Sequence, residues 1–257
     1  MLRGRGALAA LRAALILEAP PDLAVYFTTV SYSVSGALLV ARSAARERVG
    51  FDPRRYERRD WAGLTRTLPY PDGTLHQSEV SMSLARAVGA DAVPPPPYYV
   101  PDPALVSRAP AGVAYLHPGA GKLKNRWPIE RFAEVAADWI ARGLDVQVIE
   151  GPQDSGTAAA LNARVGRALP IVQGESIPML AARFAHAAVY VGNDTGPLHL
   201  AGAVGCPTVG VYGWTDPAEW RPVGSRVRSV RAADATLESI PASRVIETAE
   251  ELMEGRG

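Results

Sequence analysis

Apolar and polar positions alternate in two different periods along residues 112–253. Short apolar runs of strand length alternate with longer segments in which apolar residues follow the helical repeat. The expected strands are 113–116, 144–149, 170–172, 189–191, 208–212 and 226–230, and the expected helices are 128–142, 154–168, 176–187, 196–204 and 241–253. Strands that alternate with helices of this length predict a parallel sheet covered on both faces, a Rossmann-like doubly wound α/β domain.

The pattern before residue 92 is less regular. Residues 23–28 predict a strand, and residues 32–45 and 77–88 predict helices. The polar, arginine-rich segment 52–66 between them has no clear period. This part of the chain therefore predicts an incomplete α/β domain.

Prolines separate the two parts of the chain. The run Pro94–Pro97 is followed by Pro101 and Pro103, and such a segment favours a stiff extended linker over a helix. We therefore expect a partial α/β domain with its linker in residues 1–105 and a complete Rossmann-like domain in residues 106–257.

Composition narrows the function classes. The 257 residues are 47% hydrophobic and 21% charged, which is typical of globular domains. A net charge of +1 and the lack of a long basic run argue against nucleic acid as a partner. The single Cys206 excludes an internal disulfide and favours a reducing compartment. No apolar run reaches the ~18 residues of a transmembrane span.

The first 17 residues superficially resemble a signal peptide. Arg12 interrupts their apolar stretch, and no small-residue cleavage site follows it. We interpret the segment as a helix of the fold, with a basic amphipathic helix on a membrane surface as the alternative.

The loop between the strand 189–191 and the helix 196–204 is the first candidate for chemistry, because ligands of doubly wound sheets bind beyond the carboxyl ends of strands. Asp194 or Thr195 is expected to cap the helix, and its first amides would bind phosphate oxygens. Gly196 permits close approach of a ligand, and His199 falls in the first turn. The alternative is a plain capped helix with a buried histidine.

A second candidate loop follows the strand 113–116. Its glycine-rich turn offers a concave run of amides, and its basic side chains suit a diphosphate leaving group. The residues concerned are Gly119, Ala120, Gly121, Lys122, Lys124 and Arg126. It is not a P-loop, since the Gly-x-x-x-x-Gly-Lys-Ser/Thr spacing is missing. A solvated loop with incidental charges remains the alternative.

Three further loops lie at the same predicted edge. Asp154 or Ser155 would either bind ribose hydroxyls or cap a helix, and the loop around Glu175 would border the nucleobase. Thr215 and Asp216 favour a turn over ligand contact. The concurrence of several polar or glycine-rich loops at one edge predicts a nucleotide-sugar site.

These motifs together resemble glycosyltransferase family 9, the ADP-heptose:lipopolysaccharide heptosyltransferases. Residues 23–89 resemble the second half of the acceptor domain of that family, and residues 115–224 resemble its donor domain. The matching motifs are His117-Pro-Gly-Ala120, Arg126-Trp-Pro128, Gly192-Asn-Asp-Thr-Gly-Pro-Leu-His-Leu-Ala201 and Tyr212-Gly-Trp-Thr-Asp-Pro217.

The resemblance implies a GT-B fold and an inverting transfer from a nucleoside-diphosphate sugar, ADP-heptose by default, to a glycolipid or oligosaccharide acceptor. It implies no metal or other cofactor, and a cytoplasmic enzyme with peripheral contact to the inner membrane. The donor contacts implied are Gly119, Ala120, Gly121, Lys122, Lys124, Arg126, Asp154, Glu175, Asp194, Thr195, Gly196, Pro197, Leu198 and His199.

Two departures from the family pattern bear on activity. Asn125 stands where relatives carry a lysine, and the acidic ribose position falls on Ser155, next to Asp154. No strand with a Gly-Asp loop, the source of the general base in relatives, precedes Leu23. No catalytic residue is therefore named, and we expect poor transfer. The alternatives are a nucleotide-sugar-binding protein without transfer activity and an incomplete reading frame.

Overall fold

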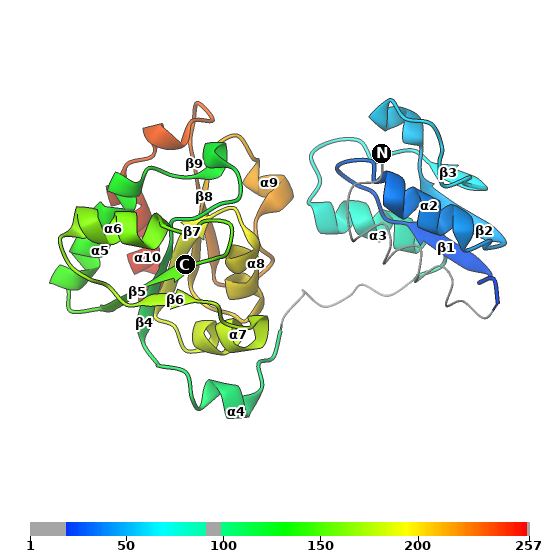
Figure 1. Cartoon of the computed structure of the whole chain (residues 1–257). Coiled ribbons are helices and arrows are strands. Elements are labelled where there is room, and N and C mark those ends of the chain that lie inside the picture. The colour runs from blue at the N-terminus through cyan, green and yellow to red at the C-terminus, as the bar shows by residue number, and fades with distance from the viewer. Residues whose placement is uncertain (1–18, 91–98, 256–257) are drawn as a thin grey trace. The chain divides into compact units, whose positions relative to one another are not determined.

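The computed structural model describes residues 19–90 and 99–255 (Figure 1). The expected helix in the first 17 residues therefore lies outside the described residues. The chain divides into two compact units, residues 1–93 and 94–257. The division falls before the predicted boundary at residue 105, because the short helix α4 (Pro103–Val106) packs against α7 (Ile177–Ala185) of the second unit.

The first unit contains a parallel three-stranded sheet in the order β1-β2-β3. One apolar cluster joins Tyr26 to Ala37 of α2, and another joins Phe51 to Val80 and Leu84 of α3, so the two helices pack in separate clusters. The elements are β1 (Leu23–Tyr26), α2 (Val34–Arg42), β2 (Glu47–Phe51), β3 (Arg66–Leu68), α3 (Gln77–Ala87) and the 3-10 turn η1 (Pro53–Tyr56).

The second unit is built on a six-stranded parallel sheet in the order β6-β5-β4-β7-β8-β9. This is the strand order of dinucleotide-binding doubly wound domains. The strands are β4 (Val113–His117), β5 (Asp145–Glu150), β6 (Ile171–Gln173), β7 (Val189–Asn193), β8 (Thr208–Tyr212) and β9 (Val227–Arg231). The remaining helical segments are η2 (Leu123–Asn125), α5 (Ile129–Ala141), α6 (Thr157–Val165), α8 (Gly196–Ala203), α9 (Pro217–Trp220), η3 (Leu237–Ser239) and α10 (Ala242–Met253).

Helices cover both faces of this sheet. On one face, α5, α6 and α10 bury an aliphatic core against the strands, with Trp127 and Trp139 completely enclosed. On the other face, α7 and α8 pack on the aromatic side chains of Tyr115, Tyr190 and Tyr212. The predicted doubly wound α/β fold is thus confirmed.

The strand order reverses between the neighbouring strands β4 and β7, which are the first and fourth strands of this sheet along the chain. His117 at the end of β4 lies in register with Gly192 of β7. The loops that follow these strands run in opposite directions over the sheet edge, which leaves a crevice for a ligand at this point. The two candidate loops predicted for phosphate are the loops that flank it.

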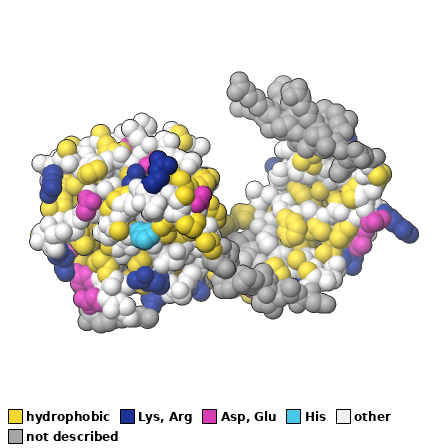
Figure 2. All heavy atoms as spheres, turned by 90° about the horizontal axis from the view of Figure 1, so that it is seen from below, with side chains coloured by type: hydrophobic (Ala, Val, Ile, Leu, Met, Phe, Trp, Pro, Cys, Tyr) yellow, Lys and Arg dark blue, Asp and Glu magenta, His cyan; other side chains and the backbone are white. Residues whose placement is uncertain are grey.

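The surface of the second unit gives no simple pointer to this site. On the face shown in Figure 2, Lys and Arg side chains lie in separate groups among apolar and uncharged surface. No helix within residues 19–90 and 99–255 is long and apolar enough to cross a membrane.

Candidate functional site

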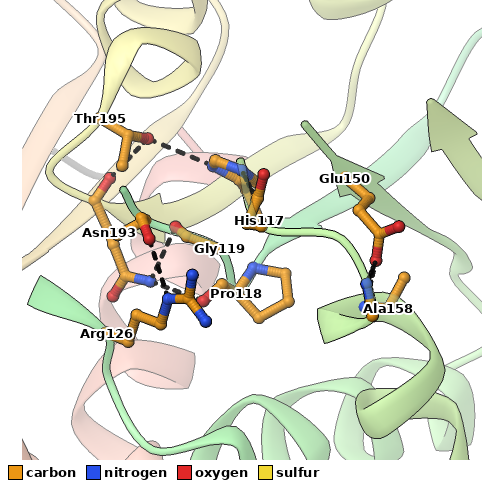
Figure 3. Close-up of polar contacts among 11 residues, drawn as sticks. His117, Pro118, Gly119, Arg126, Glu150, Ala158, Asn193 and Thr195 are labelled. Atoms are coloured by element: carbon orange, nitrogen blue, oxygen red, sulfur yellow. Dashed lines mark hydrogen bonds and ion pairs between the residues drawn. The ribbon is translucent and has the colours of Figure 1, made fainter. Parts of the chain in front are cut away.

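Asn193 connects the two loops at the switch point (Figure 3). It ends β7 and is fully buried. Its Oδ1 accepts a hydrogen bond from the Trp127 amide at 2.9 Å, and its Nδ2 donates to the carbonyls of Pro118 and Gly119 at 2.9 and 3.2 Å. One side chain of β7 therefore fixes both ends of the glycine-rich loop after β4.

The basic side chains of that loop have different surroundings. Arg126 Nε donates to the Ala120 carbonyl at 2.9 Å and so closes the turn. Lys124 Nζ lies 3.8 Å from the centre of the Trp214 ring, and Asn125 accepts a hydrogen bond from the indole N–H of Trp214 at 2.8 Å. Lys122 is exposed. The loop thus carries one closing arginine, one lysine on an aromatic ring and one lysine in solvent.

A buried chain of three side chains lies behind the loop. His117 Nε2 is 2.9 Å from Asp154 Oδ2, and His117 Nδ1 is 3.2 Å from Thr195 Oγ1. His117 and Asp154 are only 4% and 6% exposed. The three residues come from the end of β4, the loop after β5 and the start of α8, so the chain joins three separate loops of the site.

Asp154 is therefore buried and hydrogen-bonded to His117. The sequence had suggested a ribose contact or a helix cap for this residue, and not a contact with a histidine. Burial by itself raises the pKa of Asp154, but the hydrogen bond and charge of His117 and the field of Arg126 outweigh it and lower the pKa below its ordinary value. The glycine backbones pack directly on this carboxylate, since a Cβ at Gly119 would lie 1.4 Å from Asp154 Oδ2.

The cap of α6 also differs from the prediction. Asp154 and Ser155 were the expected caps, but Glu150 Oε2 accepts hydrogen bonds from the amides of Gly156 and Ala158 at 3.0 and 2.9 Å. A carboxylate at the end of β5 thus satisfies the first amides of the helix, where the helix dipole favours negative charge. The side chain of Asp154 is consequently free to turn toward His117.

The beginning of α8 is arranged for an anion. Thr195 is the N-cap residue, but its side chain makes no capping hydrogen bond and turns to His117 and the Asn193 carbonyl. The expected side-chain cap by Asp194 or Thr195 is therefore wrong, because neither side chain accepts a hydrogen bond from the first amides of α8. Asp194 Oδ1 lies 3.6 Å from His199 Nε2, whose side chain is 46% exposed. Gly196 has open space where a Cβ would stand.

Leu198 and Pro197 contribute to this helix start in other ways. The Leu198 side chain is fully buried in the core and is therefore not available to a ligand. Pro197 stands in the first turn, where its missing amide costs no helical hydrogen bond.

A pocket of about 750 Å³ opens beside α8. It lies at the carboxyl ends of β5 and β6, and its volume suits a nucleoside. Glu175 lines it and forms an ion pair with Arg183, with Nε and Oε2 2.8 Å apart. That carboxylate raises the pKa of Arg183. The lining residues are Ile149, Glu150, Gly151, Pro152, Ser155, Val172, Gln173, Gly174, Glu175, Leu180 and Pro197.

The loop with Thr215 and Asp216 forms a turn, as the sequence favoured. Asp216 accepts a hydrogen bond from the Ala218 amide at 2.9 Å and so caps α9, and it pairs with Arg231 at 2.7 Å. Within residues 19–90 and 99–255, no group of three or more His, Cys, Asp or Glu side chains is placed to hold a metal ion.

The site therefore combines a nucleoside-sized pocket, an uncapped helix N-terminus and a basic glycine loop at one switch point. The family model of glycosyltransferase family 9 (heptosyltransferase) matches residues 27–245. The chain belongs to this family. The lipopolysaccharide heptosyltransferase 3 of Escherichia coli is 26% identical over 212 residues, which cover 77% of this chain and 62% of that protein. The K12 form is 32% identical over 111 residues, 42% of this chain and 32% of its own length.

Solved structures support the GT-B fold. A family 9 glycosyltransferase from Veillonella parvula superposes with a TM-score of 0.81 at 18% identity, over 99% of this chain and 81% of that chain. The E. coli heptosyltransferase WaaC with ADP superposes with a TM-score of 0.75 at 22% identity, over 97% and 79% of the two chains. The chain nevertheless spans less than two thirds of its curated relatives.

Proposed function

We propose that this family 9 protein is a heptosyltransferase-type glycosyltransferase. It binds a nucleoside-diphosphate sugar in the second unit and transfers the sugar, with inversion, to a lipopolysaccharide-type glycan acceptor. ADP-heptose is the proposed donor, because the related WaaC has been solved with ADP and with ADP-2-deoxy-2-fluoro heptose. The acceptor would be met at the cytoplasmic face of the inner membrane.

The observation that carries the proposal is the junction of the pocket with α8. Pro197 of the first turn lines the pocket, so a nucleoside held there has its diphosphate at the helix N-terminus. Amides and the positive end of the helix dipole stabilise such an anion. Lys122 and Lys124 add charge from the opposite loop, so departure of the diphosphate requires no metal in this proposal.

Calorimetric titration of the purified chain with ADP-, UDP- and GDP-sugars tests the proposal. We expect the ADP-sugar to bind most tightly. Replacing Lys122, Lys124 and Arg126 together by Ala should weaken binding by at least about tenfold, because one hydrogen bond to a charged group contributes about 1.5–3 kcal/mol. The remaining binding should depend less on salt.

The matched control removes three arginines from helices on the other face of the sheet, the half-exposed Arg131 and the exposed Arg164 and Arg244. This variant changes the net charge equally but leaves the loop intact, so it should keep the parent affinity. Equal affinities for the parent and the loop variant would exclude the loop as the diphosphate site. Absence of binding by every nucleotide sugar would reject the proposed function.

A further inference from the structure

The buried imidazole of His117 is hydrogen-bonded at both nitrogens. Its Nε2 faces Asp154, and its Nδ1 faces the hydroxyl of Thr195, the residue immediately before α8. A neutral imidazole carries one N–H, whereas an imidazolium carries two. The charge of His117 therefore decides which atom donates in its contact with Thr195.

The two charge states leave Thr195 with different hydrogen-bonding capacity. When His117 is neutral, Nε2–H donates to Asp154, and the Thr195 hydroxyl must donate its only proton to Nδ1. When His117 is charged, Nδ1–H donates to Thr195 Oγ1, and the hydroxyl proton becomes available. In the structure it can reach the Asn193 carbonyl, 3.2 Å away. A phosphate oxygen at the start of α8 would be a stronger, charged acceptor.

We propose that His117 is a positioning residue that takes up a proton when a nucleotide diphosphate binds, and thereby makes the Thr195 hydroxyl a hydrogen-bond donor to the diphosphate. The proton comes from solvent and binds Nδ1. The imidazolium then lies between Asp154 on one side and the bound anion on the other. This inference rests on the proposed function, since it needs a diphosphate at α8.

The other groups around His117 do not take over this role. Arg126 is positive and acts on Asp154 from the glycine loop. Burial raises the pKa of Tyr190 well above its ordinary value, so this tyrosine, which lies near Thr195 and Asp154, keeps its proton. Asp194 is adjacent to Thr195 in sequence, but its carboxylate pairs with the exposed His199. Proton uptake measured on binding could therefore also come from His199, and this alternative needs its own variant.

The test measures proton uptake directly on the full chain. The heat of binding of the tightest nucleotide sugar is recorded in buffers of different ionisation enthalpy, between about pH 5 and 8, where histidines titrate. The diphosphate diester of a nucleotide sugar has no group that titrates in this range, so any linked proton belongs to the protein. We expect net uptake by the parent, and its loss in His117→Gln together with about tenfold weaker binding.

His117→Gln keeps a hydrogen-bond donor toward Asp154 but cannot be charged. It therefore distinguishes the effect of protonation at position 117 from the effect of the hydrogen bond to Asp154. His186→Gln is the matched control, because His186 is exposed at the end of α7, on the amino edge of the sheet. It should keep both uptake and affinity. If His117→Gln does not fold, Thr195→Val replaces it, which should lose uptake and affinity, whereas Thr195→Ser should retain them.

The outcomes separate this inference from the proposed function. Binding without proton uptake by the parent overturns the role of His117 and leaves the proposed function in place. Uptake that persists in His117→Gln and disappears in His199→Gln also overturns it. Failure of every nucleotide sugar to bind overturns both.

Discussion

At the scale of single residues, Asn193 stabilises the site in a way that no other amino acid reproduces. Its amide both donates and accepts, and it faces two carbonyls and one N–H within the fully buried region between β7 and the glycine loop. An aspartate has the same shape but only accepts when it is ionised. Two carbonyl groups would then face a buried carboxylate.

We therefore expect Asn193→Asp to lower the free energy of unfolding by about 3 kcal/mol or more, since unpaired buried polar and charged groups cost this much. Urea unfolding followed by tryptophan fluorescence measures it, because Trp127 and Trp139 are buried in this unit. Asn125→Asp is the matched control. It keeps the oxygen that accepts from Trp214, so a change within about 0.5 kcal/mol is expected. Equal losses in both variants would contradict this account.

Residue types in the site could be read from the sequence, but their partners could not. The motifs placed His117 and Asn193 next to strand ends and Thr195 at the start of a helix, and the glycine loop and the start of α8 lie where the pattern predicted them. Their decisive contacts join residues between 37 and 78 positions apart. No local pattern reports such a contact, so the roles of His117 and Asn193 were not predicted.

At the scale of elements, the β4–α5 loop packs closely on the β5–α6 loop. As a result, Gly119 and Gly121 differ in how well they would tolerate a side chain. The Cβ of an alanine at position 119 would overlap Asp154 Oδ2, whereas at position 121 its nearest neighbour is the flexible end of Gln153 at 3.2 Å. We expect Gly119→Ala to displace Asp154 from His117 and to destabilise the second unit by about 3 kcal/mol or more.

Gly121→Ala is the control for this prediction and should cost less than about 1 kcal/mol. Urea unfolding of both variants gives the comparison. Combining Gly119→Ala with Asp154→Gly should recover part of the loss, because the overlapping side chain, including its Cβ at 2.6 Å, is then gone. Strictly additive effects of the two substitutions would show that the overlap is not the cause.

The strands themselves explain why the sequence pattern predicted those of the second unit but missed some of those in the first. Strands buried on both faces read as continuous apolar runs, and β4, β7 and β8 are of this kind. β3 has three residues, two of them exposed, so β3 carries no strand pattern. The cap of α6 was missed because Glu150 lies in the preceding strand and reaches the helix across a loop.

At the scale of the whole molecule, each unit has its own sheet and its own apolar clusters. Every residue that forms the proposed donor site, from His117 to His199, belongs to the second unit. We therefore expect residues 99–257 to fold alone in one cooperative urea transition and to bind the preferred nucleotide sugar within about threefold of the full chain. Calorimetry of the fragment and of the full chain, side by side, measures this.

The fragment that carries Ala at Lys122, Lys124 and Arg126 is the matched control, and it should lose affinity by the same factor as the full-length variant. A single transition follows from the continuous core that α5, α6 and α10 form on one face of the sheet. A folded fragment with much weaker binding would mean that the first unit contributes directly to the donor site. A fragment without a cooperative transition would mean that the second unit needs the first for its stability.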